Sequence, residues 1–319
     1  MSPLARLLDW LSHLYNVVVV VSGGNHGATK PVLNTATLDN PDAVAADAVR
    51  SLFDAARHRR LLSPAEAVNV ITVGALHADG LDIELPDTVI DPVPAGSPAS
   101  YSPVGFGFRR SVKPEVLLPG GRQVFSAPPP GQGTGEVEVQ PVESPQKGPG
   151  LGAAAPGMAG ELDAITYSCG TSNAAALASR SLSEIMDVLE AARSEDGEAP
   201  IADAQYYPVL AKTLLVHAAG WHDSLAKMRD LLGLSGQDVR RELTRILGYG
   251  RSAASASARR SALASYCSVL DRSAKISATR SASLSHRRLQ LLRSGAASPS
   301  RWRGSRRSTS IRRSTEWRG

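Results

Sequence analysis

A Gly-Thr-Ser triplet, Gly170-Thr171-Ser172, leads into a run of small helix-forming residues from Ala174 to Ala178. A serine in the first turn of a helix lies where backbone N–H groups are unpaired and where the helix dipole favours negative charge. These conditions suit a nucleophilic hydroxyl and the oxyanion that its attack creates. A simpler interpretation is that Thr171 or Ser172 only caps the helix. The triplet by itself does not decide between a nucleophile and a cap.

A second polar group follows an apolar run. Residues Val17 to Val21 are all valine, which is typical of a buried parallel strand, and Ser22-Gly23-Gly24-Asn25-His26-Gly27 comes next as a tight loop. Ligands and reacting groups gather at the carboxyl ends of strands in open α/β sheets. Asn25 is therefore a candidate functional residue, and the simpler interpretation is a turn residue that tolerates positive φ.

Hydrophobic spacing predicts the elements that must position these residues. The first helix places leucines 4, 7, 8, 11 and 14 on one apolar stripe, with Arg6, Asp9 and His13 off it. The predicted helices cover 3–15, 42–60, 173–193, 204–219 and 236–247, and the predicted buried strands cover 17–21, 69–75 and a short piece of 113–121. This succession indicates an α/β fold.

Two segments have no such periodicity. Residues 127–160 are dominated by Gly, Pro and Ala, so we expect a long loop or insertion there. Residues 251–319 are rich in Ser, Arg and Ala and have too few apolar residues to form a core, which predicts a disordered basic tail after a domain of residues 1–250.

Charge separates the same two parts. Residues 251–319 contain 15 Arg and one Lys against one Asp and one Glu, a net charge of +14; since the whole chain carries +5, residues 1–250 carry −9. An arginine-rich tail is one way to bind nucleic acid, because arginines neutralise phosphates, but only Tyr266, Trp302 and Trp317 are available for stacking on bases. We favour the alternative that the tail is an out-of-frame translation of GC-rich DNA, in which Arg, Ser and Ala codons abound.

Composition argues against several classes of protein. Cys169 and Cys267 lie far apart in unlike surroundings, which supports neither a disulfide framework nor a metal site. No stretch approaches the roughly 20 apolar residues of a membrane-spanning helix, and no secretory signal is recognisable. We expect no cofactor, no metal and no membrane partner, and a cytoplasmic location by default, with secretion left open.

Four segments, taken in order, resemble the carboxyl-terminal part of the subtilisin-like serine proteases. They are VVVVVSGGNHG (17–27), NVITVGAL (69–76), KPEVLLPGG (113–121) and SCGTSNAAALAS (168–179). In that family a strand ends in a loop that carries the oxyanion asparagine, two further strands follow, and a Gly-Thr-Ser turn opens a buried helix. The resemblance spans residues 1–250 and implies a three-layer α/β fold with a mostly parallel sheet.

The resemblance assigns roles to residues of both loops. Ser172 matches the nucleophile, and Asn25 matches the side chain that donates a hydrogen bond to the oxyanion. Val21, Ser22, Gly23 and Gly24 match one wall of the substrate pocket, and Gly170 and Thr171 match the turn before the nucleophile. The implied reaction is hydrolysis of a protein or peptide substrate through an acyl-enzyme.

The family's other catalytic residues have no match. In the family an Asp and then a His precede the oxyanion loop, yet only 24 residues precede Asn25, and they contain neither an Asp-Ser/Thr-Gly nor a His-Gly-Thr segment. Asp9 and His13 stand four residues apart on a predicted helix, and His26 lies in the oxyanion loop itself. We therefore expect an amino-terminally truncated copy whose first strand is an exposed apolar edge.

The sequence thus predicts a serine endopeptidase by family that is inactive in this chain, because Ser172 lacks a general base. Two alternatives remain open. One is a non-catalytic protein that binds peptide or, through its tail, nucleic acid. The other is a gene fragment without a function.

Overall fold

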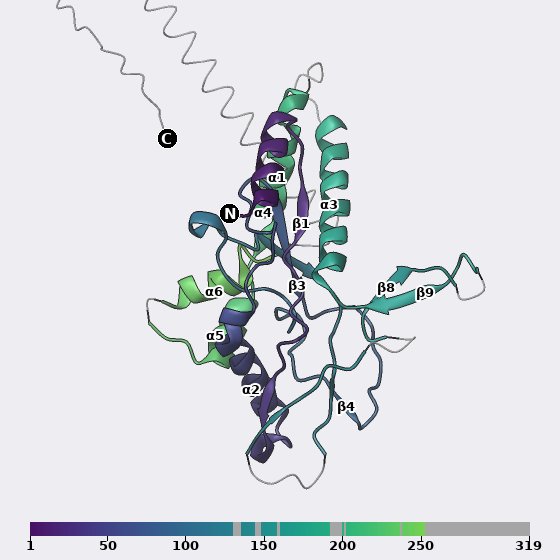
Figure 1. The fold of residues 1–319 in the computed structure, drawn as a ribbon, viewed down its shortest axis with the longest axis vertical. Helices are drawn as coiled ribbons and strands as arrows, with labels where there is room; N and C mark the ends of the chain where they lie inside the picture. Colours follow the sequence, from purple (N-terminus) through teal and green to yellow (C-terminus); the bar gives the residue numbers. More distant parts are fainter. Residues whose placement is uncertain are drawn as a thin grey trace, which may run out of the picture. The chain divides into compact units, whose positions relative to one another are not determined.

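The computed structural model describes residues 1–129, 135–143, 148–157, 160–191, 200, 202–236 and 238–252. The chain divides into two units, Met1–Ser268 and Val269–Gly319, and every described residue belongs to the first (Figure 1). Of the predicted basic tail, only Arg251 and Ser252 fall within the described residues.

A five-stranded sheet forms the centre of the first unit. Its strand order is β1 (Val20–Ser22), β3 (Ile71–Leu76), β5 (Val116–Pro119), β11 (Arg251–Ser252) and β10 (Ala219–Gly220). The first four strands run parallel, and only β10 is antiparallel to its neighbour. Every residue of β3 is buried, as expected of a strand covered on both faces.

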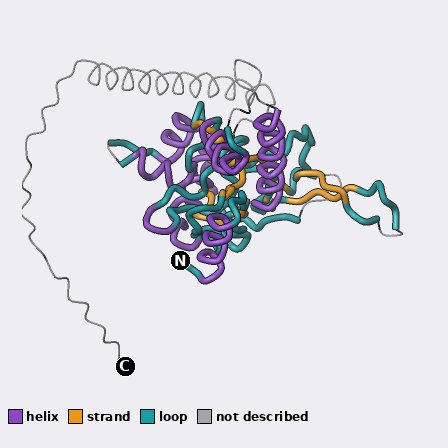
Figure 2. The backbone as a smooth tube through the Cα atoms, turned by 90° about the horizontal axis from the view of Figure 1, so that it is seen from above, coloured by secondary structure: helices purple, strands orange, loops and turns teal. Residues whose placement is uncertain are grey.

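Helices cover both faces of this sheet, which makes three layers (Figures 1 and 2). On one face, α3 (Thr171–Ala191) and α4 (Tyr207–His217) pack on Val116 and Leu118 of β5. Leu117 points to the other face, where it contacts α6 (Val239–Leu247) and its neighbours. The further helices are α1 (Pro3–Leu14), α2 (Pro41–Asp54) and α5 (Ser224–Leu232), with short 3₁₀ turns at Thr35–Thr37, Ala55–His58, Phe108–Arg110 and Ala204–Tyr206.

The α/β prediction is confirmed, with differences in detail. The valine run becomes a strand only over Val20–Ser22, and the helix expected at 42–60 ends at Asp54 before a 3₁₀ turn. Helix α5 was not predicted, although Leu225, Met228 and Leu232 stand at helical spacing in it.

The region 127–160 is not a structureless loop in its described parts. It contains β7 (Glu136–Glu138), which pairs with β2 (Val32–Asn34), and β8 (Leu151–Ala154), which pairs with β9 (Ile165–Ser168). These strands, and the pair β4 (Val89–Ile90) and β6 (Phe125–Ser126), form three two-stranded sheets outside the central one. The strands are short and mostly exposed, so the hydrophobic pattern could not reveal them.

The leucine face of α1 packs on the core only in part, through the half-buried Leu8. Ala5 and Ser12 are the buried residues of this helix, and Ala5 contacts Ala67 and Val70. Leu4, Leu7 and Leu14 are 48, 47 and 53% exposed. The helix predicted at 3–15 forms over Pro3–Leu14, and its most buried apolar residue is the small Ala5 and not a leucine.

Candidate active site

Ser172 is the second residue of α3, and its side chain is exposed. Among the described residues, no hydrogen bond is formed by its hydroxyl. The helix starts here because Gly170 donates its N–H to the Gly120 carbonyl at 2.9 Å, which fixes the turn against the end of β5. The Ser172 N–H belongs to the first turn, whose amides have no partner within the helix. Ser172 therefore combines a hydroxyl group without a hydrogen-bond partner among the described residues and a backbone N–H without a partner in the helix.

Asn25 lies beside this helix start although 146 residues separate it from Thr171. Its Oδ1 accepts hydrogen bonds from the Thr171 N–H at 2.8 Å and from the Thr171 hydroxyl at 2.9 Å. Asn25 is thus an N-cap supplied from a distant loop. Because an N–H must face the oxygen, the contact also fixes the amide orientation, and Nδ2 is left to donate elsewhere.

The amide nitrogen of Asn25 points along the Gly170 backbone. A Cβ atom at Gly170 would lie 3.2 Å from Asn25 Nδ2, so a glycine keeps this approach open. Among the described residues, Nδ2 has no hydrogen-bond acceptor. The Asn25 amide and the Ser172 N–H are two donors of the kind that stabilise an oxyanion.

The other predicted binding residues form two groups, one at the end of β1 (Val21, Ser22, Gly23 and Gly24) and one at the start of α3 (Gly170 and Thr171). The groups are joined by the hydrogen bond from the Gly24 N–H to the Thr171 hydroxyl oxygen, 3.2 Å long. Val21 instead packs with α1, against the cluster of Ala5, Ala67 and Val70. The structure thus brings Gly24, Asn25 and Thr171 together, and the binding role of the whole set stays a prediction.

The two glycines after β1 are also required by the chain's own packing. A Cβ at Gly23 would lie 2.5 Å from Pro103, and one at Gly24 would lie 2.6 Å from Leu62. Gly24 has a φ of +110°, which side-chain-bearing residues rarely adopt. The packing and the backbone conformation of the loop therefore require glycine at both positions, independently of any role in substrate binding.

No described histidine is bonded to Ser172. His26 follows Asn25 directly in the same loop, but its Nε2 donates to the Arg60 carbonyl at 2.7 Å. Burial lowers the pKa of His26, the charge of Arg59 lowers it further, and the bond to Arg60 opposes both. His77 is fully buried with its Nε2 at 2.7 Å from Asp91 Oδ1. In the described part of the chain, Ser172 has no hydrogen-bonded general base.

The Lys-Pro-Glu segment directly precedes β5 and so lies at the amino ends of the parallel strands, whereas the Asn25 loop follows the carboxyl end of β1. Lys113 is 1% exposed, and its ammonium contacts Glu115 Oε1 and the Val70 carbonyl, the latter at 2.8 Å. The other Glu115 oxygen accepts from the Thr72 N–H at 2.7 Å. Burial lowers the pKa of Lys113 to about 8, against the opposing effect of Glu115. This buried pair ties the start of β5 to β3.

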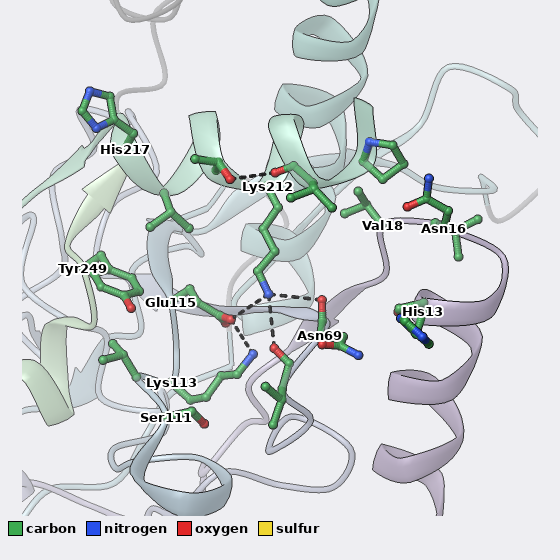
Figure 3. A pocket seen from close by; sticks show the side chains of 18 residues that line it. His13, Asn16, Val18, Asn69, Ser111, Lys113, Glu115, Lys212, His217 and Tyr249 are labelled. Carbon is green, nitrogen blue, oxygen red and sulfur yellow. Dashed lines mark hydrogen bonds and ion pairs between the residues drawn. The ribbon is translucent and has the colours of Figure 1, made fainter. Parts of the chain in front are cut away.

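A cavity of about 760 Å³ opens beside this pair, and Lys212 reaches across it (Figure 3). Its ammonium donates to the carbonyls of Val68, Asn69 and Val70 at 2.9–3.2 Å and lies 3.4 Å from Glu115. The ammonium groups of both lysines thus donate their hydrogen bonds to groups of the protein. The cluster stabilises the amino ends of the strands and is far in the fold from the oxyanion loop.

The described residues contain neither a metal-binding cluster nor a membrane-spanning helix. No group of three or more His, Cys, Asp or Glu side chains there is arranged to hold a metal ion. Within the same residues, no helix has the length and apolar character needed to cross a membrane.

The structure thus combines a mostly parallel sheet covered by helices, a helix that begins at an exposed serine, and an asparagine loop that caps this helix. Residues 3–250 match the Subtilase family, peptidase S8, so the chain belongs to this family. Proteases of this kind act on peptide substrates. An uncharacterized protein of Sinorhizobium fredii, y4bN, is 36% identical over 125 residues, which is 38% of this chain and 27% of that protein. The chain therefore aligns with only about a quarter of that relative's length. No solved structure matches the chain significantly.

Proposed function

We propose that this chain carries the nucleophile and the oxyanion donors of serine-type peptide hydrolysis. The observation that supports the proposal most directly is the bond of Asn25 to Thr171 at the start of α3, next to the exposed Ser172. Among the described residues, neither the Ser172 hydroxyl nor the Asn25 amide nitrogen has a hydrogen-bond partner. In this reaction the Ser172 oxygen attacks the substrate carbonyl, and the carbonyl oxygen becomes the anion that the two donors stabilise. Removing one such donor typically costs about 3 kcal/mol of transition-state stabilisation.

The proposal includes inactivity of this chain by itself towards peptides. The attacking hydroxyl must lose its proton, and the leaving amine must gain one; a general base-acid performs both transfers. In the described residues no imidazole or carboxylate is bonded to Ser172. Residual acceleration should be no more than the oxyanion donors and substrate binding supply.

An activated ester separates these two claims, because its leaving group needs no proton. We expect slow transfer of the acyl group from p-nitrophenyl acetate to Ser172, rising with pH as hydroxide replaces the missing base, and detectable as an added acetyl group by mass spectrometry. Ser172→Ala should remove this modification, and Asn25→Asp should reduce it while retaining the cap to Thr171. Ser179→Ala, an exposed serine on the same helix, is the matched control.

Two results would contradict the proposal. Acetylation of Ser172 at the rate of other exposed serines would remove the nucleophile and oxyanion assignment. Labelling of the purified chain by a fluorophosphonate probe, absent in Ser172→Ala, would show an activated serine and so overturn the predicted inactivity.

A further inference from the structure

One cavity, of about 840 Å³, carries a concentration of positive charge. Four arginines line it, and among the described residues of its lining Glu66 is the only carboxylate. The arginines are Arg57, Arg60, Arg110 and Arg245. Met1 also lines the cavity, but the four arginines belong to internal segments of the chain. A cavity of this size suits a small ligand or a short stretch of peptide.

Three of the four arginines are not neutralised by the part of the chain that the structure describes. Arg245 is ion-paired with Glu242 of its own helix. We call Arg57, Arg60 and Arg110 the cavity arginines; each is exposed, and none forms an ion pair with a described residue. Three arginines against one carboxylate give these side chains a net charge of +2, although residues 1–250 together carry −9. The cavity therefore attracts anions from a body that otherwise repels them.

Backbone hydrogen bonds hold the walls of the cavity together. The Val104 N–H donates to the carbonyl of the buried Arg59, which directly precedes one cavity arginine, at 2.6 Å. The Phe108 N–H donates to the Glu66 carbonyl at 3.3 Å and so joins the turn Phe108–Arg110 to the same segment. The cavity arginines thus project from a backbone that is already fixed, which lowers the entropic cost of binding a ligand there.

The turn that carries Arg110 has a backbone conformation that favours glycine. The φ values of Arg109 and Arg110 are +52° and +64°, in the left-handed region. Arg109 lies over the Phe108 ring, with its guanidinium carbon 5.4 Å from the ring centroid. Strain of this kind concentrates at functional sites, where the surrounding structure maintains it. The fold thus keeps an arginine at the cavity where a glycine would fit the backbone better.

The segment that carries Arg60 also contacts the oxyanion loop. The Arg60 carbonyl accepts from His26 Nε2 at 2.7 Å, and the Leu62 N–H donates to the Gly23 carbonyl at 3.1 Å. Arg60 therefore has its carbonyl on the oxyanion loop and its side chain on the cavity. A ligand in the cavity and a peptide at the oxyanion loop would lie against one continuous segment of the chain.

We propose that this cavity binds an acidic stretch of a peptide substrate, whose Asp or Glu side chains pair with the three cavity arginines. The planar guanidinium group matches a carboxylate with two parallel hydrogen bonds. The peptide class of the ligand rests on the proposed function. A short acidic stretch fits better than a nucleic acid, because the positive charge is confined to one cavity and the net charge of −9 on residues 1–250 opposes a long chain of phosphates.

Arginine footprinting of the full chain tests the inference residue by residue. Phenylglyoxal modifies accessible guanidinium groups, and mass spectrometry measures the rate at each arginine with and without a short polyglutamate peptide as the probe. We expect the peptide to slow modification of all three cavity arginines and to leave the exposed Arg240 of α6, which is not in the lining, unchanged. Arginines of the basic tail give separate signals, so binding of the probe to residues 251–319 is read independently.

Two single variants test whether the cavity arginines act together. Arg60→Ala should reduce the protection of Arg57 and Arg110 about threefold, because the peptide loses one exposed ion pair, whereas Arg240→Ala should not change it. Arg110→Gly should reduce the protection of Arg57 and Arg60 without lowering Tm, since glycine suits the φ of +64°. This variant keeps the test independent of any loss of folding.

Protection of the cavity arginines no stronger than that of Arg240 would overturn the proposal, and so would protection that Arg60→Ala leaves unchanged. A single-stranded oligonucleotide that protects the cavity arginines better than the peptide would also overturn it and assign the cavity to nucleic acid. Acylation of Ser172 by a small neutral ester does not use the cavity. Failure of the footprint with normal acylation therefore refutes the acidic-peptide site alone, and the reverse result refutes only the proposed chemistry.

Discussion

The Thr171 N–H donates to Asn25 Oδ1 across 2.8 Å, and this bond joins the loop after β1 to the first turn of α3. One side chain thereby has two functions. Its oxygen caps the helix, and its nitrogen is the proposed oxyanion donor. Substitutions can separate the two, since each uses a different atom of the amide.

Asn25→Ala removes both atoms and should lower the free energy of unfolding by about 1 kcal/mol, the usual cost of a lost N-cap, or roughly 2–4 °C in Tm. Asn25→Asp retains an acceptor at the positive end of the helix dipole and should leave Tm close to the wild type. Thermal unfolding measures both. Equal losses in the two variants would show that the cap does not depend on the oxygen.

Gly24→Ala should destabilise the protein by about 3 kcal/mol, because its φ of +110° and the Leu62 side chain both oppose a methyl group. Gly27→Ala is the control, since nothing lies within 4 Å of a Cβ there. Adding Leu62→Ala to Gly24→Ala should relieve the overlap only in part, because the Cβ of residue 62 still lies 2.9 Å from the new methyl group, and it should not relieve the backbone strain. Urea unfolding curves measure each step. Equal stability of the Gly24 and Gly27 variants would refute this account.

The pH dependence of stability should report the buried Lys113. Its pKa is about 8 in the folded protein against 10.5 for the free side chain, so between these values only the unfolded chain holds the proton. Stability should therefore rise from pH 8 to pH 10.5, by up to about 3 kcal/mol from this group. Lys113→Met should remove this contribution to the slope. A wild type and variant with the same pH dependence of unfolding would exclude it.

Arg59→Ala should be among the more damaging substitutions. The guanidinium is 4% exposed and donates to the carbonyls of Leu52, Ala99 and Ser102, which would lose these donors inside the protein. We expect a loss of about 3 kcal/mol. Arg57→Ala, at an exposed position two residues away, should change stability by no more than about 0.5 kcal/mol. Chemical denaturation of the pair decides the point.

The sequence predicts best what depends on local pattern. The run at 69–75 becomes β3, because a strand buried on both faces is a short continuous apolar run. The residues after Ser172 become α3, because a helix buried on one side repeats its apolar residues every three or four positions. The positions of Ser172 and Asn25 next to each other came from a family resemblance, not from spacing. Their catalytic roles remain predictions, and so does the domain boundary at 250.

What the sequence could not give depends on contacts between distant residues. The cap from Asn25 to Thr171 joins residues 146 positions apart, and the sequence around either residue does not indicate the contact. The pairing of β2 with β7 joins short, half-exposed strands in which alternation is too brief to detect. The direction of the leucine side of α1 follows from the small Ala5 that faces the sheet, which a periodicity analysis treats as only a weak apolar residue.

The place of β11 in the sheet has a consequence for the order of folding. Arg251 pairs with Leu117 on one side, and Arg251 and Ser252 pair with Gly220 and Ala219 on the other. A strand made late in synthesis thus lies inside the sheet, and β10 has no described neighbour except this one. During translation, β10 must wait some thirty residues before it can join, so α5 and α6, which lie between the two strands in sequence, are made before the sheet is complete.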